Sequence, residues 1–166
     1  MGAVHIQTSG GNLVYNVPYA AFSRKPMEMR MPGSIIREHG NQRVIAEGAW
    51  LDDYDYREDP QLMDETGSAM VQGNFFIDSG EHFAIGAPKA NKLTGKVYVC
   101  YKCFYPRAER KDGNDKNPSF QVELESSKKQ TGERFGAAVA AVDLDGDGID
   151  ELVIGAPLFS SKVSMK

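Results

Sequence analysis

The sequence predicts an all-β fold, specifically a partial β-propeller made of four-stranded antiparallel blades. Apolar runs of strand length alternate with turn-rich segments, a segment of 22 residues recurs, and its second copy contains an acidic, glycine-rich loop between two apolar runs. A period somewhat above 50 residues with several short strands in each copy is typical of propeller blades rather than of helical solenoids.

The repeat is visible when the chain is shifted against itself by 69 residues. Residues 67–88, GSAMVQGNFFIDSGEHFAIGAP, then align without a gap with residues 136–157, GAAVAAVDLDGDGIDELVIGAP, and seven of the 22 positions are identical. Five of the other positions exchange one apolar residue for another. We therefore expect the two copies to form the same local structure.

The repeat divides the chain into four parts. We expect the end of a preceding blade in residues 1–48, an acidic inter-blade loop in 49–66, a complete blade in 67–130, and the first half of the next blade in 131–166. Apolar and β-branched runs predict the strands of the complete blade near 67–73, 82–86, 96–104 and 120–125. In the first part, we expect 11–16 to form a third strand and 42–46 the outer strand, with 18–33 as a loop.

The acidic loop of the second copy has the composition of a calcium site. Calcium takes six to eight oxygen ligands, and a short loop supplies them only where carboxylates recur closely and a glycine permits a sharp turn. The flanking runs, 136–142 and 152–154, predict strands on both sides of the loop. The expected ligands are the carboxylates of Asp143, Asp145, Asp147 and Glu151 and the carbonyl of Ile149, with Asp150 pointing away.

Two other interpretations of this loop compete with the calcium site. An EF-hand requires a bidentate glutamate at loop position 12 and helices on both flanks, but position 12 counted from Asp143 is Ile154, in a β-branched run. An acidic turn that only closes a hairpin is the second alternative, since Asp and Gly are common in turns. Closely spaced carboxylates repel one another unless they are neutralised, which favours calcium.

The first copy of the loop differs at the positions that matter for a metal. Asn74 and Asp78 stand at two of the expected ligand positions, whereas Phe76 and His82 replace the other two carboxylates. We therefore predict that the earlier loop binds no calcium.

The order of these motifs resembles the FG-GAP repeat of integrin α subunits. Phe135 and Gly136 precede the acidic loop, IGAP follows it, and GKVYV follows the first IGAP. The similarity covers residues 49–161 and is to the middle of the seven-bladed propeller, around its fourth and fifth blades. Two positions depart from the family: Glu151 stands where aspartate is usual, and Thr66 replaces the phenylalanine of the first FG pair.

The resemblance implies a non-catalytic cell-adhesion receptor on the extracellular side of the plasma membrane. Such a propeller pairs with an integrin β subunit and presents loops to extracellular-matrix ligands. In those receptors an aspartate of the corresponding inter-blade loop pairs with a ligand arginine, and the matching residues here are Asp52, Asp53 or Asp64. An acidic segment of this kind is also typical of a solvated loop, and the sequence leaves both interpretations open.

An alternative function comes from a different class of protein. FG-GAP repeats also occur in calcium-containing extracellular enzymes, so the chain could be a propeller module whose catalytic domain lies outside these residues. The chain itself contains no P-loop or GxSxG motif, and its three histidines lie in no nucleophile or metal motif. We therefore predict no enzymatic activity for these residues.

Composition narrows the range of partners. The net charge of −4 gives no electrostatic reason to expect nucleic acid or an anionic membrane. No apolar run approaches 18 residues, so we expect membrane attachment only through parts of a longer type I membrane protein. Cys100 and Cys103 form a CxxC motif without a second ligand pair, which argues against zinc and leaves their pairing open.

Overall fold

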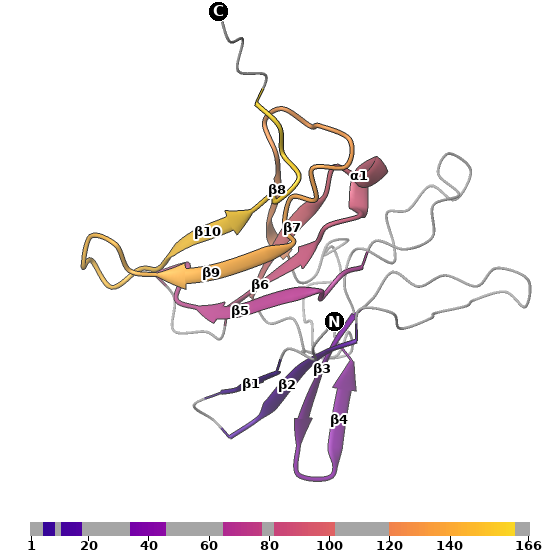
Figure 1. Cartoon of the computed structure of the whole chain (residues 1–166). Coiled ribbons are helices and arrows are strands. Elements are labelled where there is room, and N and C mark those ends of the chain that lie inside the picture. The colour runs from indigo at the N-terminus through magenta and orange to yellow at the C-terminus, as the bar shows by residue number, and fades with distance from the viewer. Residues whose placement is uncertain are drawn as a thin grey trace, which may run out of the picture.

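The structure is a computed structural model that describes residues 5–8, 11–17, 34–45, 65–77, 82–101 and 120–161. These residues form three antiparallel sheets and one short helical turn (Figure 1). In this part of the chain, no helix has the length and apolar character needed to cross a membrane.

Two of the sheets are four-stranded meanders and the third is a hairpin. The first sheet contains β1 (His5–Gln7), β2 (Leu13–Val17), β3 (Ser34–His39) and β4 (Gln42–Ile45), in that order. The second contains β5 (Ala69–Gly73), β6 (His82–Ala87), β7 (Lys96–Tyr101) and β8 (Phe120–Glu125), with the short turn α1 (Ala90–Leu93) between β6 and β7. The hairpin consists of β9 (Ala138–Val142) and β10 (Glu151–Gly155).

The predicted fold class is confirmed, because the described chain is built of antiparallel four-stranded sheets with almost no helix. All six strands expected in the two copies are present, and β4 is an edge strand as expected. The predicted third strand at 11–16 corresponds to β2, which is the second of four strands, and β1 and β3 were not predicted. The expected loop at 18–33 lies outside the described residues.

The 69-residue repeat is preserved in the strand pairing. Ala69 pairs with Gly86 in the first copy, and the equivalent Ala138 pairs with Gly155 in the second. The same offset relates the other residue pairs of β5 and β6 to those of β9 and β10. Equivalent sequence positions therefore occupy equivalent places in the two hairpins.

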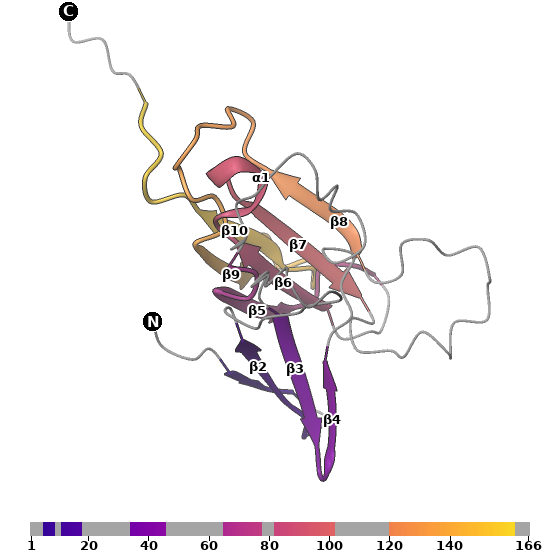
Figure 2. The ribbon, with the colours of Figure 1, turned by 90° about the vertical axis from the view of Figure 1, so that its right-hand side faces the viewer.

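The second sheet lies between the first sheet and the β9–β10 hairpin (Figure 1 and Figure 2). Successive strand residues point to opposite faces, and both faces of β6 and β7 are covered, so these strands are apolar after their first residues, His82 and Lys96. One face contributes Met70, Phe83, Ile85, Tyr98 and Cys100 to a core shared with Val14 and Ile35 of the first sheet. The other face contributes Ala84, Val97 and Val99 to a core shared with Val139, Leu152 and Ile154 of the hairpin.

Cys100 belongs to the first of these cores. Its side chain is fully buried and disulfide-bonded. The other cysteine of the CxxC motif, Cys103, lies outside the described residues. A cysteine held in a disulfide has no thiolate to offer a metal, which agrees with the argument against a zinc site.

Backbone atoms approach closely where the second sheet meets the hairpin. A Cβ atom added to Gly86 would lie 2.0 Å from the carbonyl oxygen of Gly136. Gly136 has a φ of +85°, and a Cβ atom there would lie 2.5 Å from the carbonyl oxygen of Lys96. Both positions therefore require glycine, which explains the glycine after Phe135 and the glycine of the first IGAP segment.

A buried carboxylate also joins the two copies. Glu65 is 3% exposed, and its Oε1 lies 2.7 Å from Nζ of Lys89 while its Oε2 lies 3.0 Å from Nη2 of Arg134. Arg134 is the repeat equivalent of Glu65, and both have left-handed backbones, with φ of 53° and 58°. Next to Glu65, the carbonyl of Gly67 accepts a hydrogen bond of 2.7 Å from the side-chain amide of Asn16. The turn before β5 thus contacts both neighbouring layers.

We predict that Gly86→Ala destabilises the chain by about 3 kcal/mol or more, at the upper end of the cost of overpacked cores, because its Cβ would meet backbone rather than a movable side chain. The measurement is chemical unfolding followed by circular dichroism. Gly155→Ala is the matched control at the equivalent position, where the nearest atom would be the Cβ of Ala138 at 3.2 Å. Equal losses for both variants would contradict the proposed close approach.

We predict that Glu65→Gln lowers the free energy of unfolding by about 2–3 kcal/mol, because Lys89 and Arg134 lose their shared counter-ion. The value lies below the range for fully buried pairs because the side chains of these two partners are 34% and 32% exposed. Glu123→Gln, which removes a surface partner of Lys96 that is 48% exposed, should cost less than about 1 kcal/mol. A Glu65 variant as stable as the Glu123 variant would refute the stabilising role of the buried Glu65 carboxylate.

Candidate metal centre

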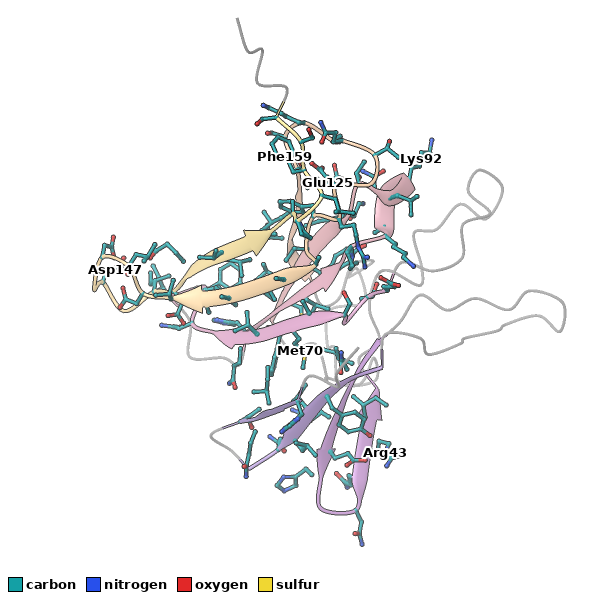
Figure 3. All side chains as sticks on the ribbon, in the orientation of Figure 1. Arg43, Met70, Lys92, Glu125, Asp147 and Phe159 are labelled. Atoms are coloured by element: carbon teal, nitrogen blue, oxygen red, sulfur yellow. The ribbon has the colours of Figure 1, made fainter. Side chains whose placement is uncertain are left out.

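The acidic loop connects β9 to β10 and turns at two glycines. Gly146 and Gly148 have φ of +78° and +86°, values that side chains with a Cβ rarely adopt. A Cβ atom added at either glycine would meet no other part of the chain within 4 Å. Figure 3 shows Asp147 at the tip of this connection, at the end of the hairpin farthest from the C-terminal segment. The loop is therefore open to solvent and accessible to an ion.

Three of the four predicted carboxylate ligands come together in this loop. Asp143, Asp145 and Glu151 each offer an oxygen atom, and these oxygens all lie within 4.8 Å of one another. Asp143 directly follows β9, whereas Glu151 is the first residue of β10. The hairpin register, in which Val142 pairs with Glu151, places these two ends side by side.

Backbone N–H groups of the loop hold these carboxylates in place. Asp143 accepts hydrogen bonds from the amides of Gly146, at 2.7 Å, and Gly148, at 3.0 Å. Glu151 accepts one from the amide of Leu144, at 2.8 Å. An ionised carboxylate has about four lone-pair sites, so each retains acceptor capacity for a cation. The backbone of the loop thus surrounds its own carboxylates, and their oxygen atoms can still coordinate a cation.

The two remaining acidic residues of the loop, Asp147 and Asp150, lie outside this group of three carboxylates and accept other hydrogen bonds. Oδ1 of Asp147 accepts a hydrogen bond of 2.8 Å from the amide of Ile149, and Asp147 lies outside the group of three. Oδ2 of Asp150 accepts a hydrogen bond of 2.7 Å from the amide of Asn74 in the first copy. The five-residue ligand set that includes Asp147 and the Ile149 carbonyl stays a prediction.

The equivalent positions of the first copy are filled by rings. Phe76 and His82, which correspond to Asp145 and Glu151, pack edge to face with ring centroids 5.0 Å apart and an interplanar angle of 79°. His82 is fully buried at the start of β6. This pair of rings occupies positions that hold carboxylates in the second copy, and Asp78 lies outside the described residues.

The second candidate site from the sequence falls in a part of the chain that the structure does not describe. Asp52, Asp53 and Asp64, the three aspartates considered for ligand binding, lie outside the described residues. Their role stays a prediction. The contact of Asn74 with Asp150 was missed by sequence reasoning, because it joins two loops that are brought together only by the stacking of the sheets.

Comparison with known proteins agrees with this geometry. Residues 135–164, which include the acidic loop, match the family described as FG-GAP repeat. Integrin alpha-PS2 of Drosophila melanogaster is 35% identical over 94 residues, which make up 57% of this chain and 6% of that protein. Integrin alpha-5 and integrin alpha-4 of Xenopus laevis are each 33% identical, over 58% and 57% of this chain and 8% of each relative.

The resemblance to integrin α subunits that the motifs indicated is therefore confirmed, and the FG-GAP match at 135–164 covers the whole second copy. The chain spans less than a tenth of the length of the curated relatives it matches. The comparisons support an integrin-like propeller module.

Proposed function

We propose that this integrin-like FG-GAP module is part of a non-catalytic adhesion receptor and contains one structural calcium site. The observation that carries the proposal is the group formed by Asp143, Asp145 and Glu151 within a matched FG-GAP repeat. A set of carboxylate oxygens without nitrogen or sulfur donors suits a hard cation such as calcium.

The donor set fits calcium in number as well as in kind. The three grouped carboxylates are joined in the proposal by Asp147 and by the carbonyl of Ile149, and water supplies the rest of the six to eight ligands. Asp147 and Ile149 lie between the two ends of the loop, so the proposed ligands are all local in sequence. Glu151 stands where aspartate is usual in the family. In the proposal, its carboxylate reaches the ion from the first position of β10.

The proposed role of the ion is structural. It neutralises carboxylates that would otherwise repel one another, and it links Asp143 at the end of β9 to Glu151 at the start of β10. The hydrogen bonds that hold Asp143 and Glu151 come from backbone amides of the loop itself. We therefore propose that the site stabilises the hairpin rather than taking part in a reaction.

The domain boundaries are part of the same proposal. Residues 67–130 would form one blade and 131–166 the first half of the next, which leaves the outer face of the β9–β10 hairpin for further strands. Val142 and Val153 on that face are 39% and 50% exposed. Their exposure supports continuation of the stack in a longer protein, with 1–48 belonging to the preceding blade and 49–66 to the loop between them.

As an integrin α-like receptor, the longer protein is proposed to pair with an integrin β subunit and to bind extracellular-matrix ligands outside the cell. Asp52, Asp53 and Asp64 remain the proposed ligand-binding residues. The relatives named above are all integrin α subunits, which favours the receptor over an enzyme-associated propeller.

We predict that calcium raises the thermal stability of the natural chain and not that of Asp145→Ala. At a calcium concentration a hundredfold above the dissociation constant, a ligand that binds only the folded state adds about 2.7 kcal/mol. The measurement is calorimetric unfolding with and without calcium, and a chelator should reverse the effect. Glu123→Ala, which removes an exposed carboxylate of β8, is the control that keeps the response. Full calcium stabilisation of the Asp145 variant would refute the site.

The receptor assignment predicts an association with a β subunit at the cell surface. An antibody against this chain should precipitate an integrin β subunit together with the natural protein from surface-labelled cells. A precipitate that contains the natural protein without any β subunit, and that hydrolyses a substrate, would instead support the enzyme-associated module.

A further inference from the structure

The turn after β5 makes three hydrogen bonds with the acidic loop of the next copy, all of them through Asn74. The amide of Asn74 donates to Oδ2 of Asp150 at 2.7 Å, and its carbonyl accepts from the amide of Asp150 at 2.8 Å. The side-chain amide of Asn74 donates to the carbonyl of Gly148. One residue of the first copy therefore contacts Gly148 and Asp150, the residues immediately before and after Ile149.

The stacking of the sheets brings these loops together. β5 and β9 end side by side (Figure 1), and a Cβ atom added to Gly73 would lie 2.8 Å from the Cβ of Ala141. The residue after Gly73 therefore lies directly beside the end of β9, where the acidic loop begins. The contact depends on the position of the turn rather than on a long or mobile side chain.

Asn74 is also the repeat equivalent of Asp143, the first residue of the acidic loop. In the second copy, Asp143 accepts hydrogen bonds from two amides of its own loop. In the first copy, Phe76 and His82 have replaced two of the carboxylates, and Asn74 turns its side chain to the neighbouring copy. An amide donates hydrogen bonds, which a carboxylate cannot do, so asparagine suits a contact with the carbonyl of Gly148.

We propose that Asn74 is a positioning residue for the neighbouring metal loop, and that the turn after β5 acts as a clasp that raises the calcium affinity of Asp143, Asp145 and Glu151. This inference rests on the calcium site of the proposed function. It adds that the affinity of one repeat depends on a residue of the repeat before it.

The mechanism follows from the hydrogen bonds at Gly148. Its amide donates to Oδ2 of Asp143, and its carbonyl accepts from Asn74. The side chain of Asn74 therefore holds the carbonyl of Gly148, while the amide of the same residue orients the proposed ligand Asp143. Asp150 is held by its main chain and its carboxylate, directly before Glu151. A loop that is held in its binding conformation loses less entropy when it binds an ion.

The coupling is reciprocal, as linkage requires. If the clasp raises calcium affinity, calcium must strengthen the clasp by the same factor. Calcium is therefore expected to tighten the contact between the second sheet and the β9–β10 hairpin. The amide of Asp150, whose acceptor is the carbonyl of Asn74, reports this contact directly.

Asn74→Ala in the full chain tests the proposal through calcium titration calorimetry. Loss of the side-chain hydrogen bond is expected to weaken calcium binding roughly two- to twelvefold, the range for one hydrogen bond, without abolishing it. Ile77→Ala is the matched control, because Ile77 lies in the same turn and is 93% exposed. Its calcium affinity should equal that of the natural chain. Circular dichroism without calcium establishes that both variants are folded.

An unchanged calcium affinity in folded Asn74→Ala would overturn the proposal while leaving the calcium site intact. Absence of calcium binding in the natural chain would instead overturn the proposed function, so the two failures are distinguishable. A second measurement needs no variant: saturating calcium should slow hydrogen exchange of the Asp150 amide in the natural chain. A chain that binds calcium and shows no slowing at this amide would contradict the clasp.

Discussion

The close approach of backbone at Gly86 and Gly136 is the constraint on which the arrangement of this chain depends. A side chain at either position would meet a carbonyl oxygen of the facing layer. The absence of side chains allows the second sheet and the β9–β10 hairpin to come close enough for their apolar faces to share a core. Because the repeat places glycine at 155 as well as at 86, the same surface is presented again on the exposed side of the hairpin.

This approach also determines where the acidic loop lies. With the hairpin docked, β5 and β9 end beside each other, and the turn at Asn74 reaches Gly148 and Asp150. The ion-pair contact of Glu65 with Arg134 links the same two layers near the beginnings of β5 and β9. The acidic loop is therefore a local sequence feature whose surroundings come from the preceding repeat. Its two copies have diverged, one into a group of three carboxylates and the other into a pair of packed rings.

Much of this could be predicted from the sequence because the determining features are local or repeated. Apolar and β-branched runs predicted the strands of both copies, and the 69-residue offset predicted that the copies share one structure. The alternating aspartates predicted the grouping of Asp143 with Asp145. β1 and β3 were missed because β1 has three residues and β3 has adjacent isoleucines, so neither shows a sustained alternation. The left-handed turn α1, in which Asn91 and Lys92 have φ of 52° and 58°, has no distinctive signal either. The contacts of Asn74 and Glu65 depend on how layers pack, which no local pattern encodes.

The proposed calcium chemistry requires that one ion binds the loop of the second copy and that none binds the first. Anomalous diffraction from crystals of the full chain grown with calcium distinguishes the two loops without any variant. We predict a single calcium peak bound to the second loop, about 2.3–2.6 Å from the oxygens of Asp143, Asp145 and Glu151. A peak beside Asn74 and Phe76 in the first copy, or no peak at the second loop in saturating calcium, would contradict it.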